Sequence, residues 1–447
     1  MSALNIYIVT FNCAREKVDP KVFARHLLDA LPKPQAPDVL ILSLQEVAPI
    51  AYAFLGGSYL TPYFDRFRHA VEAAATAMPN GSQYTNIITR NVGMTAIMAF
   101  IPNDQANRIK WLETGGVGVG VQQMGNKGAV GLRMGYSYED EVIELAAVAA
   151  HLAPMENGLE RRNEDWKNIV RGLVFTPVNE NAVRTATKLR ASHRNTGEDE
   201  PLLPGSPDNF TIPTSGLYTP TSHLILAGDL NYRTSRSKPS PVDYQLYPQP
   251  TKDVTGPRHY SNLLKEDQLS SELRAGRTCH GLREASIRFA PTYKYSDKQQ
   301  AVAETNDGST WDWAKHRFPS WCDRILYLDL PLWMKTEDPS ASIRVNNYTS
   351  LPLMSTSDHR PVALSLSLPI TAIPTPTEAA ADGDVRINPP FTINPQWRQR
   401  RATARRKEIV VGLLAFLVLT WEGRTLILAM IIGASGGWFI MMSILAA

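Results

Sequence analysis

The sequence predicts an α/β (α+β) fold in which two mixed or antiparallel β-sheets pack face to face and are flanked by helices. The chain has 447 residues, 43% of them hydrophobic, which is enough apolar material for a large core. Six short aliphatic or β-branched runs each carry a polar functional group at one end, four at the C-terminal end and two at the N-terminal end. These groups can meet at one edge only if some strands run antiparallel, which favours mixed sheets.

Each of the six runs has the length and composition of a strand. Four strands are expected before their polar groups: Ile6–Thr10 before Asn12, Val39–Leu44 before Glu46, Val142–Ala150 before His151, and Leu224–Ala227 before Asp229 and Asn231. Two are expected after them: Asp323 precedes Ile325–Leu330, and Asp358 and His359 precede Val362–Leu368. Helices are expected at Lys21–Leu31 and Gly158–Leu173, and the irregular stretch Asn181–Pro220 indicates an insertion loop.

Charge and cysteine content exclude several classes of protein. Residues 1–397 carry 39 basic and 41 acidic side chains, so this part is no general nucleic-acid binder with a large basic face. The three cysteines, Cys13, Cys279 and Cys322, form no CxxC pair, which argues against a cysteine-rich zinc site and favours a reducing compartment.

The C-terminal part predicts a membrane anchor. Residues 425–447 contain no charged side chain, and about 20 apolar residues suffice to cross a bilayer. We therefore expect a body at 1–368, a Pro-rich linker with a basic juxtamembrane run at 369–408, and a hydrophobic tail at 409–447 whose span is 425–447. The preceding apolar run Ile409–Thr420 is too short to span alone; it either lies in the interface or forms a hairpin with the span.

The topology of the anchor follows from its basic flank. The run Arg398–Lys407 is expected on the cytosolic side, where it also attracts anionic lipid headgroups. No signal-peptide pattern opens the chain, so a tail-anchored protein with a cytosolic body is predicted. Because no basic residue follows the span, the endoplasmic reticulum membrane is favoured over the mitochondrial outer membrane.

The polar groups at the strand ends predict a metal-assisted site. The set consists of Asn12, Glu46, His151, Asp229, Asn231, Asp323, Asp358 and His359. Oxygen ligands without thiols suit Mg²⁺, and histidines among carboxylates suit hydrolysis of a phosphate ester. Taken singly, an Asp or Asn after a strand more often caps a turn, and a lone histidine is more often a hydrogen-bonded strand end. Six sites that share one pattern favour the functional interpretation.

Two longer strings carry a resemblance to a known family. Residues 228–233 read GDLNYR and residues 319–326 read PSWCDRIL, and both resemble signatures of the inositol polyphosphate 5-phosphatases. Shorter matches occur in the same order: TFN at 10–12, QEV at 45–47, GNKGAV at 125–130, HLA at 151–153, PTYKY at 291–295 and SDHRP at 357–361. The resemblance covers about residues 4–368 and implies the DNase I-like four-layer sandwich of magnesium-dependent endonucleases, exonucleases and phosphatases.

The resemblance also implies roles for the residues of the predicted site. Glu46, with Asn12 beside it, is expected to hold Mg²⁺. Asp229 is expected to orient or deprotonate the attacking water, with Asn231 touching the same phosphate. His359, held by Asp323, is expected to contact the scissile phosphate.

Three further roles follow from the same resemblance. His151 is expected to stabilise the phosphoryl charge, and Asp358 to support the network on the metal side. Lys127 is expected to approach phosphate, although its glycine-flanked loop could equally be only a turn.

A neighbouring 4-phosphate is expected to bind Tyr293, Lys294, Lys315 and Arg317, by the same resemblance. The alternative for Lys315 and Arg317 is a solvated charge cluster. The family and the hydrophobic tail together imply a phosphoinositide substrate, phosphatidylinositol 4,5-bisphosphate first. Two other functions remain open: a sphingomyelinase or nuclease of the same fold, and a membrane tether that binds phosphoinositide without hydrolysing it.

Overall fold

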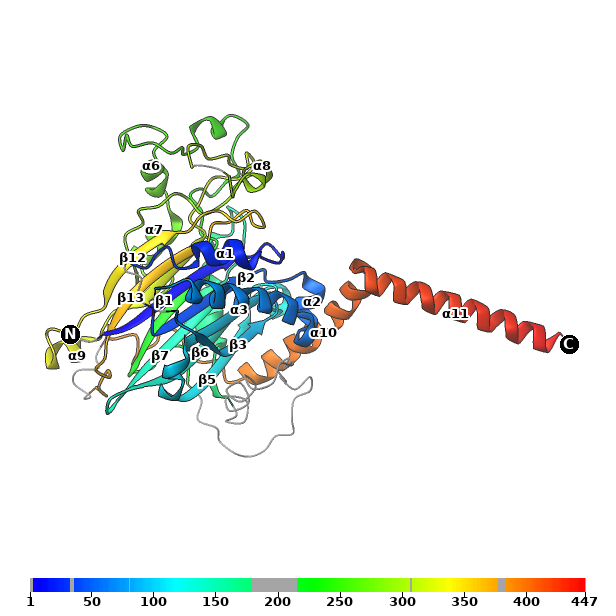
Figure 1. Cartoon of the computed structure of the whole chain (residues 1–447), viewed down its shortest axis with the longest axis horizontal. Helices are drawn as coiled ribbons and strands as arrows, with labels where there is room; N and C mark the ends of the chain where they lie inside the picture. Colours follow the sequence, from blue (N-terminus) through cyan, green and yellow to red (C-terminus); the bar gives the residue numbers. More distant parts are fainter. Residues whose placement is uncertain are drawn as a thin grey trace.

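The computed structural model describes residues 3–32, 36–79, 81–178, 215–305, 308–376 and 383–446. Two β-sheets form the centre of the molecule, as the sequence predicts (Figure 1). In spatial order, the first sheet consists of β12 (Arg344–Ser350), β13 (Val362–Pro369), β1 (Ala3–Asn12), β2 (Val39–Gln45), β4 (Thr95–Pro102) and β3 (Tyr84–Val92). The second consists of β10 (Leu282–Glu284), β11 (Asp323–Leu328), β9 (Ser222–Asp229), β7 (Glu141–His151), β6 (Gly128–Tyr138), β5 (Ile109–Gly118) and β8 (Thr176–Pro177).

Both sheets are mixed. β1 pairs with β2 in parallel and β7 with β9 in parallel, whereas the other described strand pairs are antiparallel. Each strand alternates its two faces, as the pleat requires. In β1, Ile6 and Ile8 face the second sheet, while Tyr7 and Val9 pack under the outer helices. The predicted pair of packed mixed sheets is therefore confirmed.

Helices complete the layers. They are α1 (Pro20–Leu27), α2 (Ile50–Leu55), α3 (Thr61–Thr76), α4 (Leu159–Gly172), α6 (Tyr260–Leu264), α7 (Gln268–Arg274), α8 (Asp297–Ala301) and α9 (Leu332–Glu337), with short 3₁₀ turns η1 (Gly57–Tyr59), η2 (Asn103–Arg108), η3 (Val121–Gln123) and η5 (Asp243–Leu246). Phe23 of α1 and Phe67 of α3 cover the outer face of the first sheet, and Trp166 of α4 covers the second. The sequence predicted α1 and α4 to within a few residues. Most of the predicted insertion loop lies outside the described residues.

The C-terminal segment differs from the prediction. The basic run and the apolar run that follows it form one helix, α10 (Trp397–Leu419), which packs against α2. Arg405 donates from Nη1 to the Phe54 carbonyl at 2.6 Å and from Nη2 to the Leu55 carbonyl at 3.0 Å. Those carbonyls belong to the C-terminal end of α2, where a cation is favoured. The predicted basic juxtamembrane run thus docks on the body through Arg405 and the buried Ala404, while Arg398, Arg400 and Arg406 are exposed.

The described part of the predicted Pro-rich linker also packs on the body rather than forming an extended tether. Ile373 joins a small apolar cluster with Trp333, and Trp333 Nε1 donates to the Pro374 carbonyl at 2.9 Å. Arg386 is 3% exposed and donates to the Asp329 carbonyl. Individual buried side chains, Ile373 and Arg386, fix this segment to the body. A proline-rich composition does not predict such contacts.

Helix α11 (Trp421–Leu445) projects away from the body of the molecule (Figure 1). Within the described residues it is the one helix long and apolar enough to cross a membrane, and none of its most apolar window is buried. It begins four residues before the predicted span, because Trp421–Arg424 form its first turn. The length and composition of α11 permit a transmembrane segment.

Candidate active site

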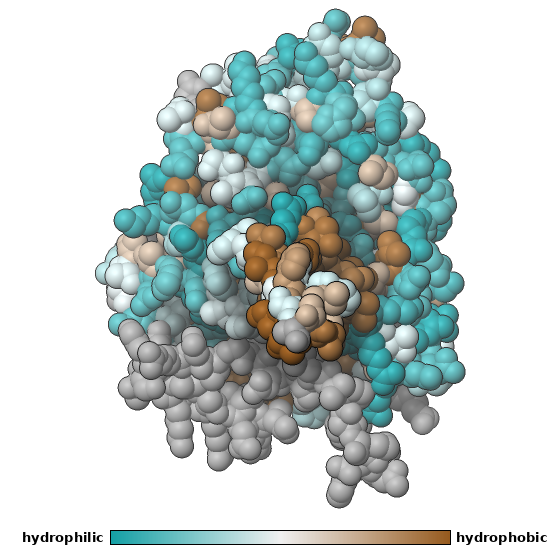
Figure 2. Space-filling model, turned by 90° about the vertical axis from the view of Figure 1, so that its right-hand side faces the viewer, coloured by the Kyte–Doolittle hydropathy of each residue, from teal (hydrophilic) through white to brown (hydrophobic). Residues whose placement is uncertain are grey.

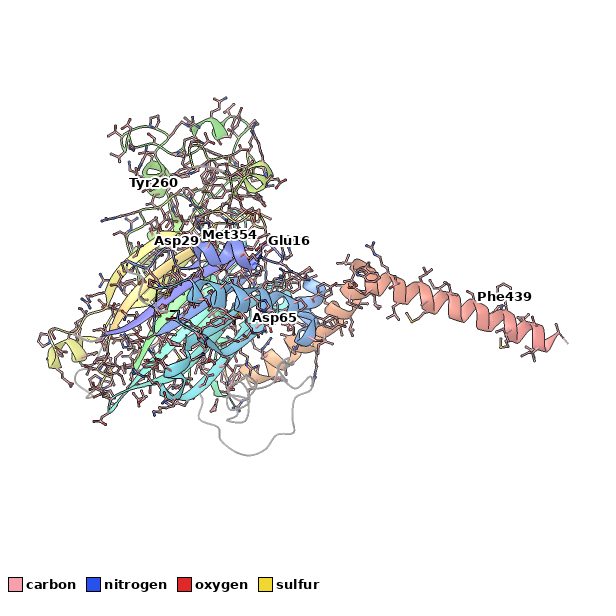
Figure 3. The ribbon with its side chains drawn as sticks, viewed as in Figure 1. Glu16, Asp29, Asp65, Tyr260, Met354 and Phe439 are labelled. Atoms are coloured by element: carbon pink, nitrogen blue, oxygen red, sulfur yellow. The ribbon has the colours of Figure 1, made fainter. Side chains whose placement is uncertain are left out.

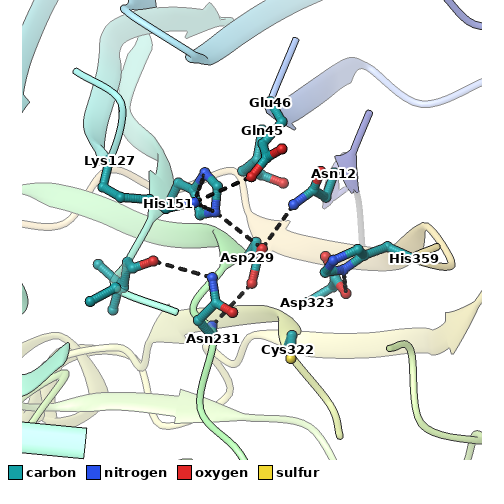
Figure 4. Close-up of polar contacts among 12 residues, drawn as sticks. Asn12, Gln45, Glu46, Lys127, His151, Asp229, Asn231, Cys322, Asp323 and His359 are labelled. Carbon is teal, nitrogen blue, oxygen red and sulfur yellow. Dashed lines mark hydrogen bonds and ion pairs between the residues drawn. The ribbon is translucent and has the colours of Figure 1, made fainter. Parts of the chain in front are cut away.

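Strand ends bring the predicted polar groups to one edge of the sandwich (Figure 4). In the second sheet, His151 of β7 is in register with Asp229 of β9, and Asp229 with Asp323 of β11. In the first sheet, Asn12 of β1 is in register with Gln45 of β2. The two rows face each other, since Asn12 Nδ2 donates to Asp229 Oδ2 at 2.9 Å across the sheets.

Backbone conformation at these ends directs the side chains into the cleft. Glu46 has φ 47° and Asn231 has φ 58°, in the left-handed region that few residues other than glycine adopt. Strained positions of this kind cluster at functional sites. Gly228 allows β9 to pack closely, because a Cβ there would lie 1.9 Å from the Ala150 carbonyl oxygen.

Asp229 is the centre of the network. Its Oδ2 accepts from Asn12 and lies 3.2 Å from His151 Nε2, and its Oδ1 accepts from the Asn231 backbone N–H at 3.1 Å. Burial alone would raise the pKa of this carboxyl, but nearby imidazoles and Lys127 outweigh burial and hold it far below its ordinary value. Asp229 is therefore a buried but ionised acceptor at neutral pH.

Glu46 and Lys127 form the second part of the site. Lys127 Nζ lies 3.3 Å from Glu46 Oε1 and 2.5 Å from His151 Nε2, and Arg15 Nε lies 3.2 Å from Glu46 Oε2. Burial acts to raise the pKa of Glu46, yet His151, Lys127 and Arg15 lower it overall. Burial, with Lys127 next, lowers the pKa of His151, so its ring is neutral at pH 7.

His359 and Asp323 form the third part. His359 Nδ1 lies 2.9 Å from Asp323 Oδ2, which also accepts from Thr292 Oγ1 at 2.7 Å. Burial opposes protonation of His359, but Asp323 and the other nearby carboxylates raise its pKa to about 9. The site thus contains a neutral histidine and a cationic one, distinguished by their neighbours.

The predicted substrate residues divide into two groups. The ring of Tyr293 lies 4.5 Å from that of His359 and 4.4 Å from the Arg233 guanidinium, and Lys294 forms an ion pair with Asp358. These residues line the same cavity as Asp229. Asp358 is thus paired with Lys294, and its Oδ1 also lies 4.0 Å from His359 Nε2.

Lys315 and Arg317 do not line this cavity. Arg317 Nη1 lies 2.9 Å from Glu156 Oε2, and its Nη2 lies 3.1 Å from the Met155 sulfur. Lys315 Nζ lies over the Tyr244 ring at 4.2 Å. The four residues predicted for the 4-phosphate therefore do not line one cavity, and Lys294, like Arg317, is already paired with a carboxylate.

The cavity has a volume of about 400 Å³ and includes cations that the sequence analysis did not assign. Arg15 follows the TFN motif, and Arg233 ends GDLNYR and donates to Asn231. Their positions next to the motifs TFN and GDLNYR could have identified them as residues of the site. Cys322 is buried, which raises its thiol pKa well above the ordinary value and excludes it as a thiolate nucleophile.

The donor set fits a divalent cation. Asp229 and Asp323 offer carboxylate oxygens within 4.8 Å of each other; His359 belongs to the same cluster, but its protonated ring is no metal ligand. Asp323 Oδ1 is buried and has no hydrogen-bond partner among the described residues, and an orphaned carboxylate oxygen of this kind suits a cation. Glu46 offers a third carboxylate in the same cavity, which Asn12 also lines.

Comparison with known proteins agrees with this geometry. The family model for Endonuclease/Exonuclease/phosphatase family 2 matches residues 9–365. A type II inositol polyphosphate 5-phosphatase of Arabidopsis thaliana is 29% identical over 66% of this chain and 25% of its own length. A polyphosphatidylinositol phosphatase of Saccharomyces cerevisiae is 28% identical over 83% of this chain and 27% of its own length. The chain thus spans about a quarter of the length of these curated relatives.

Among solved structures, the inositol polyphosphate 5-phosphatase domain of a synaptojanin superposes with a TM-score of 0.55. It is 20% identical, the match covers 92% of this chain and 90% of that one, and that structure holds inositol (1,4)-bisphosphate and a calcium ion. This likeness supports the fold. The resemblance inferred from the motifs is confirmed, and the chain belongs to the endonuclease/exonuclease/phosphatase family 2, with inositol polyphosphate 5-phosphatases as its curated relatives.

Proposed function

We propose that this protein is a membrane-anchored phosphoinositide 5-phosphatase that converts phosphatidylinositol 4,5-bisphosphate to phosphatidylinositol 4-phosphate with Mg²⁺. The observation that carries the proposal is the ionised Asp229, held by Asn12, His151 and Asn231 at the floor of a cation-rich cavity. The names of the curated relatives support the reaction class.

Asp229 acts on the attacking water. Its hydrogen bonds fix the carboxylate and keep it deprotonated, so it can orient a water and accept its proton. His359 carries a positive charge at neutral pH and stabilises the negative charge that develops on the phosphoryl oxygens. Asp323 keeps that imidazole charged and fixes its orientation through Nδ1.

Residues on the other side of the cleft bind and orient the phosphate. Neutral His151 and cationic Lys127 lie together there, and Arg15 adds a second cation. Asn12 and Glu46 would hold Mg²⁺, with Asp229 nearby. A divalent cation bound there would withdraw charge from the phosphate oxygens and from the departing inositol oxygen.

A second phosphate fits beside the first. Lys294 and Tyr293 line the same cavity as Asp229 and His359, and the Arg233 guanidinium lies 4.4 Å from the Tyr293 ring. A lysine ammonium and an arginine guanidinium in one cavity suit the binding of a neighbouring dianionic phosphate. The 4-phosphate is therefore assigned to Tyr293 and Lys294, with Lys315 and Arg317 recruited only if Glu156 releases Arg317.

The membrane anchor matches a lipid substrate. Helix α11 would hold the domain at the cytosolic face of a membrane. Glu16, which lines the active-site cavity, lies on the side of the body from which α11 projects (Figure 3). Anchoring raises the effective concentration of a lipid substrate. We extend the proposal to the endoplasmic reticulum membrane, which imaging of a protein tagged at its N-terminus would test.

The deciding experiment measures phosphate release by the full chain in detergent from phosphatidylinositol 4,5-bisphosphate, with Mg²⁺ or with a chelator. Release that requires Mg²⁺, yields phosphatidylinositol 4-phosphate and disappears in Asp229→Ala supports the proposal. Binding of the lipid by a folded protein without release would identify a tether. Hydrolysis of sphingomyelin or DNA, with none of inositol lipids, would assign the protein to another branch of the fold.

A further inference from the structure

A second cavity lies at the base of the membrane helix. It has a volume of about 600 Å³ and is enclosed by α10, the turn between α2 and α3, and the end of β3. None of its described lining residues also lines the active-site cavity. It is therefore a separate site, and the catalytic mechanism does not account for it.

One wall of this cavity is apolar and adjoins the membrane helix. Leu413, Phe416 and Leu417 of α10 line it, together with Leu426 in the second turn of α11. Figure 2 looks along α11 from its C-terminal end, where a hydrophobic group of side chains stands out against a mostly hydrophilic surface. An apolar wall continuous with a transmembrane segment meets the acyl region of a bilayer.

The other wall is basic. Arg68 of α3 and Arg401 and Arg405 of α10 line it, and their side chains are 36%, 19% and 24% exposed. Their ion-pair partners, Asp65 and Glu408, are not among the residues that line the cavity. Arg68 donates through all three guanidinium nitrogens, and Arg405 donates through both Nη atoms, to acceptors of the protein. Arg401 donates only through Nη1, to Glu408, so among the described residues it is the direct donor to an anion, while the other two arginines contribute positive charge. No described acidic residue lines the cavity to repel an anion.

The order of these groups along α10 matches the profile of a lipid. From Arg401 and Arg405, the lining changes to Ile409 and Leu413 and then to Phe416, away from the body and toward α11. A phospholipid in the cytosolic leaflet presents its groups in the same order, with its phosphate toward the protein body and its acyl chains alongside the span. Arginine is also the side chain best suited to a phosphate.

We propose that this cavity binds one anionic glycerophospholipid of the bilayer that holds α11. Arg401 binds its phosphate, the other two arginines contribute positive charge, and the acyl chains lie against Leu413 and Phe416. The proposal rests on the membrane anchor but not on catalysis, because no catalytic residue takes part. Bound in this way, the lipid fills the space between α10 and the domain on the membrane side.

The test uses the full chain purified in a neutral detergent, with phosphatidylserine or phosphatidylcholine added and bound lipid counted by native mass spectrometry. We expect one retained phosphatidylserine per chain and at least tenfold less phosphatidylcholine. Leu413→Trp, which fills the cavity, should abolish retention. Val410→Trp is the matched control, since Val410 is exposed on the same helix but does not line the cavity.

A second variant tests the basic wall without altering the contacts of α10. Arg68→Gln keeps a polar side chain toward Asn86 and Thr89 but removes the charge, and phosphatidylserine retention should fall at least fivefold. Unchanged thermal unfolding shows that both variants fold. Retention of phosphatidylserine by folded Leu413→Trp, or equal retention of the two lipids by the unaltered chain, would overturn the proposal. Neither outcome depends on phosphatase activity, so the two proposals fail separately.

Discussion

Two clusters of buried charged residues, one around Glu408 and one in the active-site cavity, both contact the loop that contains Gly125 and Lys127. Lys127 extends from the loop into the active site, whereas the backbone N–H of Gly125, two residues earlier, donates to Glu408 Oε1 of α10 at 2.8 Å. Glu408 is fully buried, and Arg401 and Arg405 each lie 3.4 Å from its carboxylate. Both of its oxygens are thus engaged by described residues, and the cluster is closed.

The active-site cluster is open by contrast. Its carboxylates and cations face a cavity of about 400 Å³, and one oxygen of Asp323 has no described partner. A buried charge with a complete set of internal partners holds elements together, while one with partners to spare is available to a ligand. The comparison therefore assigns a structural role to Glu408, and the open cluster of Asp229 and Asp323 is the one that we propose for chemistry, although the same loop meets both clusters.

The largest expected effect separates the two clusters. Asp229→Asn should lower kcat by about 10³-fold, because the amide cannot accept a proton from water. Its melting temperature should fall modestly, because the folded state stabilises the ionised carboxylate and the new amide nitrogen must face a donor from Asn12 or Asn231. Steady-state kinetics and thermal unfolding on the same sample give both numbers. Loss of folding alongside activity would mean that Asp229 is structural and would erase the contrast.

Glu408→Ala should show the opposite pattern. It leaves two arginines without their shared carboxylate and Gly125 without an acceptor, so the free energy of unfolding should fall by about 3 kcal/mol. Activity should fall only severalfold, through the loosened position of Lys127. Glu408→Gln, which retains an acceptor for Gly125, should restore most of that activity but only part of the stability. A variant as inactive as Asp229→Asn yet fully stable would contradict this assignment.

The charge on His359 predicts a pH dependence. With a pKa of about 9, the imidazole is protonated below that value, so kcat should decline as pH rises through 9. His359→Gln should lose about 100-fold in kcat and should lack this alkaline decline. Rate profiles from pH 6 to 10 decide the matter. An alkaline decline that persists unchanged in the variant would assign it to another group.

A buried histidine without a described hydrogen-bond partner supplies a third case for the comparison, and its effect is seen only at acid pH. Neither ring nitrogen of His223 has a described hydrogen-bond partner, and burial, assisted by Arg386, lowers its pKa to about 3. The unfolded chain binds a proton there below about pH 6.5, whereas the folded chain does not. Stability from this group is thus complete above that pH and is lost toward pH 3 at about 1.4 kcal/mol per pH unit.

Chemical denaturation between pH 7 and 4 measures that slope, with His223→Leu as the reference. The leucine variant should lose stability less steeply on acidification. Parallel curves for the two proteins would show that the ring becomes protonated without unfolding.

The sequence predicted the sheets and most of the site because both follow from local pattern. Strand periodicity places Asn12, His151 and Asp229 at strand ends, and antiparallel pairing then brings Asp323 to the same edge. The engagement of Arg317 by Glu156 could not be predicted, since a pair 161 residues apart leaves no local trace. The docking of α10 escaped prediction for the same reason, because Glu408 and Gly125 are 283 residues apart.

The rigid connection of α10 to α11 has a consequence for the geometry of the reaction. Only Thr420 separates the two helices, and α10 is fixed to α2 by Arg405 and by Gly412, whose backbone packs against Phe54. A domain mounted in this way turns with its anchor and has little reach of its own. With α11 in a membrane, as we propose, its encounters would be two-dimensional, with lipids that diffuse laterally through the same leaflet. Turnover should follow the mole fraction of substrate in that membrane and be insensitive to other vesicles added to the solution.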